Sequence, residues 1–371
     1  MLKIAFRFMM YDKSKTLGAA VGVVVAIFLI GQQTGIFLFL TGLMDALVEN
    51  TEADIWIVGE NVEDVNSLSG IDFRKGNEAR SIEGVEKVYP LVISGSTLRM
   101  RNGKSTPVTL IGSLAPEFVG GPWNIAKGDI RQLVNQGGVA IDLYDLNTLG
   151  DIKLGDEISL GGKLVELKAI TKGARGFGAT NVYTNISLAR EIGGFPAYEV
   201  SAFLVNVKPG VSHEKVAARI NANVSGIRAY TKDQFSWSTV TKILQEGAIG
   251  ESIGSLIIFA IVAGSVIIGL TLYSAAIDRI DDYATMKAIG TRQSVITKLI
   301  LLQAAIIAVA GFIVGSLLIQ AFRWAVEGSG LRFSFSWYIW LIFLVVTLII
   351  SLSGAYFASK SIRKVKPSKV F

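Results

Sequence analysis

The side chains that could do chemistry are few and are scattered along the 371 residues. The sequence has no Cys, which excludes thiolate metal sites and disulfides. It has a single His, His213, so it lacks the residues that a His-based catalytic or zinc site requires. Carboxylates stand in adjacent pairs at Glu63-Asp64 and Asp156-Glu157. Paired carboxylates can carry out hydrolysis, but adjacency in sequence does not by itself make a site. We therefore expect no catalytic residue and no metal site in this chain.

The tripeptide Gly103-Lys104-Ser105 resembles the end of a nucleotide-binding loop. In the pattern GxxxxGK[ST] the first glycine would stand at position 98, which is occupied by Leu98. The tripeptide also lies between two strand-like runs, whereas a phosphate-binding loop opens a helix. The motif HExxH is absent from the sequence. These observations predict that the chain itself binds no nucleotide or other cofactor.

The charged residues are unevenly distributed and leave four long uncharged windows. Only 18% of the residues are charged and 51% are hydrophobic, and each window runs for 24 to 29 residues without Asp, Glu, Lys or Arg. About 20 apolar residues suffice for a helix to cross a bilayer. We expect transmembrane helices over residues 17–47, 252–277, 295–322 and 337–359. The first window is too long for a signal-peptide core of about 7–15 residues, which favours a retained signal anchor.

Lys and Arg near the windows predict the orientation of the chain in the membrane. The N-terminal segment, the connection between the second and third windows and the C-terminal tail together have a net charge of +9, whereas residues 48–251 have a net charge of −3. Both termini, with a helix over 1–16 and a tail over 360–371, are therefore expected on the inner side of the membrane. Residues 48–251 and the short loop 323–336 are expected on the outer side. The basic excess indicates topology and contact with anionic lipid rather than nucleic-acid binding.

Residues 48–251 have the texture of a separate α+β domain, with short β-like runs between turn residues. Strands are predicted over Ala53–Val58, Thr97–Met100, Val108–Ile111 and Ser201–Val207, the second and third joined around Asn102-Gly103. Helices are predicted over residues 77–82 and from Ser212, as N-cap, to about Val224. The elements could form one sheet with helices on one face. Residues 116–196 are predicted to be an insertion of mostly β character, with strands over 158–160 and 164–170.

Two further segments of this region have alternative interpretations. The glycine-rich stretch Gly173–Gly178 is expected to be a mobile loop, either a plain surface turn or a contact for a partner. From Lys232 to about Asp278 few residues break a helix, so one continuous helix into the second span is expected. Its glycines, Gly264 among them, would also permit close helix packing in lipid.

Polar side chains near the middle of the predicted spans are uncharged. Gln32 and Gln33 lie in the first span and Gln303 in the third, and no ionisable residue lies in the middle of a span. A proton- or ion-coupled transporter usually has an ionisable group near the bilayer midplane. The sequence therefore argues against secondary transport and against a polar channel.

The connection between the second and third windows, Ile277–Val295, is more patterned than a simple turn. Apolar and charged residues alternate in it as in a helix that lies along a membrane surface, and Gly290 would end that helix. Two interpretations explain the pattern. The segment is either a short cytoplasmic turn whose charges fix the membrane topology or a docking element for a cytosolic partner.

The residues Asp282–Gly290, DYATMKAIG, resemble the coupling-helix signature E-x-G-x-L-[RK]-A-[LI]-G of the MacB/FtsX-like ABC transporter permeases. Lys287 to Gly290 match it, whereas Asp282 and Ala284 replace its usual Glu and Gly. The basic start LKIAFRFMMYDKSKT and the tail Ser359–Ser368 are similar to motifs of the same family, as are Ile82–Val88 and Leu154–Ile158 outside. One span, a large domain and three further spans is the topology of that family. The stretch Phe177–Val182 makes the chain most similar to its DevC-like group.

The resemblance implies a non-catalytic permease subunit of a dimeric ABC transporter, with ATP and Mg bound by a separate cytosolic ATPase. It also implies the inner membrane of a bacterium, with the N-terminal amphipathic helix and both termini in the cytoplasm and residues 48–251 in the periplasm. The permease would drive export or efflux from the periplasm by mechanotransmission, with a periplasmic adaptor and an outer-membrane channel as further partners. Alternatives are a LolC/LolE-like lipoprotein-release permease, an FtsX-like regulator of cell-wall hydrolases and an ATPase-independent sensor. The resemblance assigns ATPase coupling to Arg279, Asp282, Tyr283, Met286, Lys287, Ala288, Ile289 and Gly290. It assigns a second ATPase contact to Lys3 and Arg7, and a periplasmic partner contact to Arg175, Gly176 and Phe177.

Overall fold

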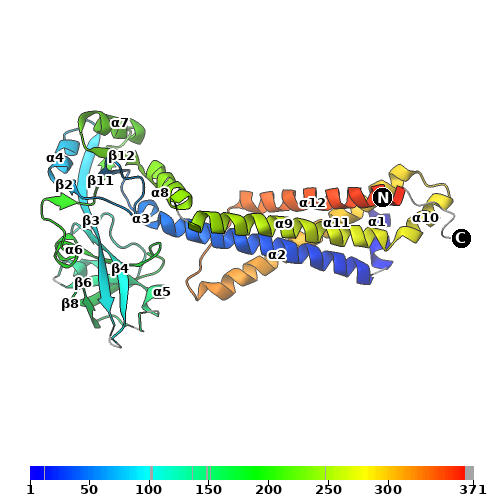
Figure 1. The fold of residues 1–371 in the computed structure, drawn as a ribbon, viewed down its shortest axis with the longest axis horizontal. Helices are drawn as coiled ribbons and strands as arrows, with labels where there is room; N and C mark the ends of the chain where they lie inside the picture. Colours follow the sequence, from blue (N-terminus) through cyan, green and yellow to red (C-terminus); the bar gives the residue numbers. More distant parts are fainter. Residues whose placement is uncertain are drawn as a thin grey trace. The chain divides into compact units, whose positions relative to one another are not determined.

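The computed structural model describes residues 1–11, 13–100, 103–135, 137–147, 149–150, 152–246 and 248–363. The chain divides into two compact units. We call residues 1–39 with 251–371 the helical unit and residues 40–250 the sheet unit. Figure 1 shows the helices and strands of each unit along the chain.

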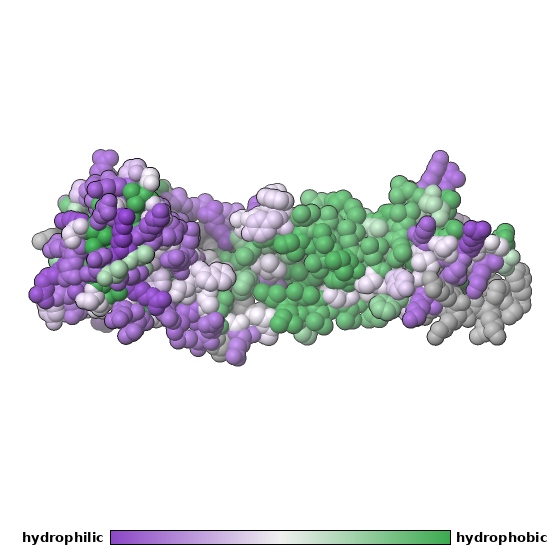
Figure 2. Space-filling model, turned by 90° about the horizontal axis from the view of Figure 1, so that it is seen from above, coloured by the Kyte–Doolittle hydropathy of each residue, from purple (hydrophilic) through white to green (hydrophobic). Residues whose placement is uncertain are grey.

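The helical unit consists of long apolar helices and two short ones. Its elements are α1 (Leu2–Tyr11), α2 (Lys13–Met44, which continues into the sheet unit), α9 (Ala248–Ile277), α10 (Ile280–Ala288), α11 (Gln293–Glu327) and α12 (Trp337–Arg363). Within the described residues, four segments are long and apolar enough to cross a membrane, namely Thr16–Met44, Gly250–Ile277, Gln293–Glu327 and Trp337–Lys360. The side of this unit seen in Figure 2 is apolar over most of its length. The prediction of four spans with a large domain between the first and second is confirmed.

Glycines let the long helices of this unit approach closely. A Cβ on Gly264 of α9 would lie 2.9 Å from Cδ1 of Ile30 on α2, as expected for a packing glycine. On α11, a Cβ on Gly311 would lie 2.6 Å from Cγ1 of Val23, and one on Gly315 would lie 2.9 Å from Cγ2 of Ile27. These two residues form a GxxxG pair, which is the pattern that allows helix backbones to come together in lipid.

The sheet unit contains the remaining helices and every described strand. The strands are β1 (Ile55–Gly59), β2 (Ile71–Asp72), β3 (Val85–Arg99), β4 (Ser105–Ser113), β5 (Ile125–Gly128), β6 (Gly138–Asp142), β7 (Glu157–Leu160), β8 (Lys163–Thr171), β9 (Thr180–Asn185), β10 (Glu199–Val200), β11 (Ala202–Val207) and β12 (Ile227–Thr231). The helices are α3 (Ala46–Glu49), α4 (Arg74–Arg80), the 3-10 turn η1 (Ile130–Val134), α5 (Leu143–Leu146), α6 (Ile186–Gly193), α7 (His213–Asn223) and α8 (Lys232–Glu246).

Most of the strands form one mixed sheet in the order β12-β1-β11-β3-β4-β9-β6-β8-β5, with β7 paired to β3 and β8. The pairs β4–β9 and β6–β8 are parallel, and the other pairs of this sheet are antiparallel. Residues 116–196 supply β5 to β9 and extend the same sheet beyond β4. They are a continuation of the central sheet rather than a separate β layer.

The sheet buries both of its faces, and helices contribute to each. Successive residues of β1 alternate between two cores, with Ile55 and Ile57 in one and Trp56 and Val58 in the other. The first core includes residues of α4, α6 and α7, and the second includes residues of α3 and α8. The expectation that helices cover one face only was therefore wrong. Helix α3, which follows the first span in sequence, and α8, which precedes the second, cover the other face.

The helix expected from Lys232 to about Asp278 corresponds to two described helices. Helix α8 ends at Glu246 and α9 begins at Ala248. Residue 247, which joins them, lies outside the described residues, so the continuity of the helix stays a prediction.

Candidate functional site around helix α10

Helix α10 is a nine-residue helix in the connection between α9 and α11. It begins after Arg279 and ends before Gly290, whose φ of +94° lies in the left-handed region that glycine adopts without strain. Thr291 N donates to Met286 O at 3.0 Å and Gly290 N donates to Lys287 O at 3.0 Å, which satisfies the last carbonyl groups of the helix. A short helix that ends at Gly290 was the prediction for this connection.

The first part of the predicted coupling set faces the core of the helical unit. Arg279 is 5% exposed and Tyr283 is 1% exposed, and Ala284 is also buried. Arg279 Nη2 donates to Thr16 Oγ1 at 2.8 Å, and Tyr283 Oη donates to Gln303 Oε1 at 3.0 Å. Burial raises the pKa of Tyr283 to about 12, so this hydroxyl remains a donor at neutral pH.

The other predicted residues lie at or near the surface of the helical unit. Asp282, Ala288 and Gly290 are exposed, and Ile289 is 81% exposed. Met286 and Lys287 are half-buried, with Met286 packed against the core of the unit. The predicted set therefore divides into an inward-facing part and an outward-facing part that ends in an exposed branched apolar side chain.

Helix α1 belongs to the same unit and presents its two predicted residues to the surface. Ala5 and Met9 are buried against the core that also contains Tyr283. Lys3 and Arg7, which are four residues apart, are exposed. Residues spaced by four lie on one side of a helix, so the basic pair shares a face that the core does not cover.

The third predicted group lies in the sheet unit and is anchored rather than free. Asp142 Oδ2 accepts from Gly173 N at 2.5 Å and from Ala174 N at 2.9 Å. Arg175 Nε donates to Asp145 Oδ1 at 3.0 Å, and burial raises the pKa of the Asp145 carboxyl while the guanidinium opposes that rise. These bonds connect the first half of Gly173–Gly178 to β6 and α5, and the expected mobility of the loop stays a prediction. Gly176 and Phe177 are half-buried.

The acidic pairs that could have formed a hydrolytic site have structural partners. Glu63 Oε2 lies 2.8 Å from Lys242 Nζ, and Asp64 Oδ1 accepts from Asn66 N at 2.8 Å. Asp156 Oδ2 accepts from Lys153 N at 3.0 Å. Across the part of the chain that the structure describes, no three His, Cys, Asp or Glu side chains are grouped as metal ligands.

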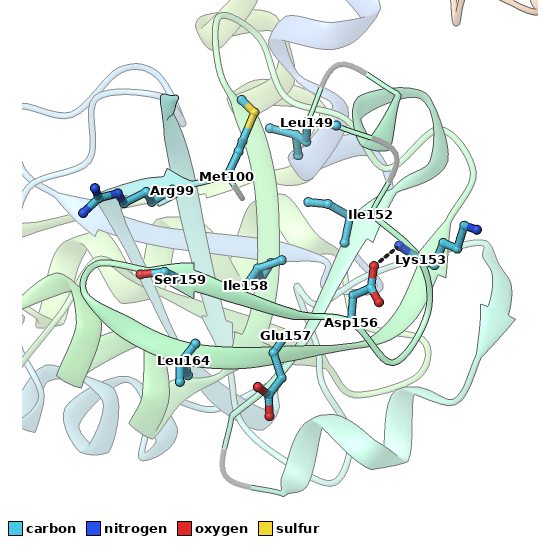
Figure 3. A pocket seen from close by; sticks show the side chains of 11 residues that line it. Arg99, Met100, Leu149, Ile152, Lys153, Asp156, Glu157, Ile158, Ser159 and Leu164 are labelled. Atoms are coloured by element: carbon cyan, nitrogen blue, oxygen red, sulfur yellow. Dashed lines mark hydrogen bonds between the residues drawn. The ribbon is translucent and has the colours of Figure 1, made fainter. Parts of the chain in front are cut away.

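Asp156 and Glu157 line an open cavity of about 600 Å³ in the sheet unit, shown in Figure 3. Its wall combines charged side chains with apolar ones from the ends of β3 and β7 and from the loop before β7. The lining residues are Arg99, Met100, Leu149, Gly150, Ile152, Lys153, Asp156, Glu157, Ile158, Ser159 and Leu164. Among the described lining residues, two basic and two acidic side chains are present.

Sequence reasoning missed the partners of the inward-facing residues. The sequence indicates Gln303 only as a polar residue within a span, and it gives no indication of a role for Thr16. A glutamine inside an apolar window was the available signal, because lipid tolerates an unpaired amide poorly. The register that brings Tyr283 to Gln303 depends on how α10 folds back on α11, which local pattern does not determine.

Comparisons with known proteins agree with this organisation. Residues 16–223 match the family model of the MacB-like periplasmic core domain, and residues 254–367 match that of the FtsX-like permease C-terminal region. The comparison with curated protein sequences gave no significant match.

Two solved structures align with part of this chain at low identity. The extracellular domain of the noncanonic ABC-type transporter YknZ from Gram-positive bacteria aligns with a TM-score of 0.36 and 13% identity, covering 48% of this chain and 98% of that one. The periplasmic region of MacB from Actinobacillus actinomycetemcomitans aligns with a TM-score of 0.39 and 12% identity, covering 55% of this chain and 99% of that one.

The two family regions follow one another with a single gap and together account for most of the sequence. The first of them covers more than half of the chain and contains most of the segment between the first and second spans. The chain therefore belongs to the MacB/FtsX-like family of ABC transporter permeases.

Proposed function

We propose that this chain is the non-catalytic membrane subunit of an ABC transporter and that the outward-facing part of α10 docks on a separate cytosolic ATPase. The family implies an ATPase partner and a dimer of the permease. The observation that carries the assignment is Ile289, a branched apolar side chain that is 81% exposed at the end of a short helix between two spans. An exposed apolar anchor beside charged residues is what a protein groove recognises.

The charge pattern supports a cytoplasmic location for this surface. Residues 1–15, 278–298 and 360–371 together carry a net charge of +9, and such basic segments remain on the cytoplasmic side. Lys3 and Arg7 are exposed on α1, within the same helical unit, and would form a second contact with the ATPase. ATP and Mg would then bind to the ATPase, and this chain would hold no cofactor.

The transport mode that these features favour is mechanical export. The four candidate spans contain no ionisable residue near their centres, which fits force transmission better than a polar path through the bilayer. In this proposal the two copies of the permease form a homodimer in the inner membrane. The sheet unit works in the periplasm with an adaptor and an outer-membrane channel, and Arg175, Gly176 and Phe177 contribute to the partner contact.

Replacing Ile289 with Asp tests the docking surface. A charge buried without a partner costs several kcal/mol, so we expect ATP hydrolysis linked to the permease to fall by at least about tenfold. The measurement is the ATPase activity of the reconstituted complex, together with the amount of ATPase that co-purifies. Leu154→Asp is the matched control, because Leu154 is an exposed apolar residue of the sheet unit.

Unchanged hydrolysis and co-purification in Ile289→Asp would contradict the docking assignment. If no ATPase co-purifies with the parental chain, the result favours the alternative of an ATPase-independent sensor over the proposed function. Met286→Asp is the less selective variant, because Met286 also packs against the core of the helical unit.

A further inference from the structure

Two polar side chains of the α10 region enter the core of the helical unit one turn apart. Arg279 and Tyr283 are four residues apart, so their side chains lie on the same side of the helix. Both are nearly inaccessible to solvent. Their surroundings are apolar and include Met9, Ile296 and Ile300. In such a setting a polar group is stable only with a partner, and the partner's position becomes fixed.

Arg279 connects α10 to the first two helices of the chain. Its Nη2 donates to Thr16 Oγ1 of α2 at 2.8 Å. Thr16 Oγ1 in turn donates to Met9 O of α1 at 2.9 Å. One relay of hydrogen bonds therefore joins the start of α10 to α2 and to α1. A charged donor makes the first of these bonds stronger than a neutral one.

Tyr283 connects α10 to the third span. Its hydroxyl donates to Gln303 Oε1 of α11 at 3.0 Å, and Gln303 is itself buried. Thr16, Arg279 and Gln303 line one cavity of about 20 Å³, so the two connections meet at the same point of the core. Apolar contacts can slide past one another, whereas hydrogen bonds of this kind fix distance and direction.

We propose that Arg279 and Tyr283 are positioning residues that clamp α10 to α1, α2 and α11, so that a displacement of α10 moves these helices with it. The inference rests on the proposed function, since it needs an ATPase that displaces α10. It separates the predicted coupling set into two roles. Ile289 contacts the partner, while Arg279 and Tyr283 pass the motion to the spans.

The test uses the full chain in its complex with the co-purifying ATPase. The chain has no Cys, so Trp237→Cys, at an exposed site on α8, gives a single labelling position. Spin labels there report the ATP-dependent change in distance between the two copies of the dimer. ATP hydrolysis and co-purification are measured on the same samples.

Tyr283→Phe removes only the hydroxyl, and Thr16→Val removes the hydroxyl that accepts from Arg279. In each variant we expect the population that undergoes the ATP-driven change to fall about fivefold, the factor to which one lost hydrogen bond corresponds. Hydrolysis and co-purification should persist, because Ile289 is untouched. Thr16→Ser keeps the hydroxyl and should keep the response, and Tyr356→Phe is the matched control at an exposed tyrosine of α12.

A full ATP-driven change in both Tyr283→Phe and Thr16→Val would overturn the clamp. Tyr283→Phe combined with Gln303→Leu replaces both partners with apolar groups and guards against simple misfolding. If this double variant folds, hydrolyses ATP and still responds fully, the clamp is also refuted. If the parental complex hydrolyses ATP without any distance change, the proposed function fails, and that outcome is separate from failure of the clamp alone.

Discussion

Asp142 shows how a single residue determines the behaviour of a loop. It has no exposure to solvent, and it is the N-cap of α5, where Oδ1 accepts from Tyr144 N at 3.1 Å. Its Oδ2 accepts from Thr171 Oγ1 at 3.0 Å in addition to the amides of Gly173 and Ala174. The carboxylate thus joins β6, α5, β8 and the glycine-rich loop. Composition alone predicts mobility for GARGFG, because the residue that anchors it lies about 30 residues earlier.

Replacing Asp142 with Asn should destabilise the sheet unit and release the loop. An amide has only one acceptor oxygen, so a buried donor loses its partner at a cost of about 1–3 kcal/mol. Thermal unfolding of the full chain in detergent and hydrogen exchange at residues 173 and 174 measure the two effects. Asp129→Asn is the control, because Asp129 is an N-cap at the surface that accepts from Arg131 N and Asn caps equally well. Equal stability of both variants would disprove the anchoring role.

At the residue scale, the sequence predicted local bonds better than distant ones. Ser212 was expected as an N-cap and accepts from Lys215 N at 3.4 Å. The expected turn at Asn102-Gly103 falls partly outside the described residues, and so does the end of the expected motif Ser359–Ser368. The bonds of Tyr283 and Arg279 join residues 20 and 263 positions apart in sequence. A cap depends on neighbours along the chain, whereas these bonds depend on the tertiary fold.

At the element scale, uniform patterns were easier to interpret than interrupted ones. The uncharged windows predicted the spans because apolar composition alone suffices for a helix in lipid. Strand β3 runs from Val85 to Arg99, whereas only its last residues were expected. Pro90 and Gly95 interrupt its pattern, and both usually disfavour a strand interior. Tertiary pairing with β11 and β4 on either side overrides those local preferences.

The GxxxG pair of α11 gives an element-scale prediction. Gly315→Leu should separate α11 from α2, since even a Cβ there would meet Ile27. Overpacking of a tight contact costs about 1–3 kcal/mol, so the melting temperature of the purified chain should fall. Gly18→Leu makes the same change on α2 at a site where a Cβ meets nothing within 4 Å, and it should leave the melting temperature nearly unchanged. Comparable losses in both variants would contradict the packing explanation, because the change from Gly to Leu raises helix propensity and cannot itself cause a loss.

At the scale of the whole molecule, charge and hydropathy follow the division into units. The visible side of the sheet unit in Figure 2 is largely hydrophilic, whereas that of the helical unit is largely apolar. Aromatic side chains gather where α11 ends and α12 begins, with Phe335 packed against Phe333, Trp340 and Phe343. Such clusters are typical of the boundary between lipid and water. The four-span fold and the positive-inside rule together predict on which side of the membrane the sheet unit and the two termini lie.

Cysteine labelling in intact cells tests that orientation. Because the chain has no Cys, single substitutions at Tyr11 on α1 and at Tyr198 in the sheet unit each create a unique exposed thiol. A membrane-impermeant maleimide should label Tyr198→Cys in intact cells and Tyr11→Cys only after permeabilisation, because the basic segment that contains α1 is retained in the cytoplasm. The parental chain should remain unlabelled throughout. The reverse pattern would place α10 and Ile289 outside the cell, where no ATP is available, and would exclude coupling to a cytosolic ATPase.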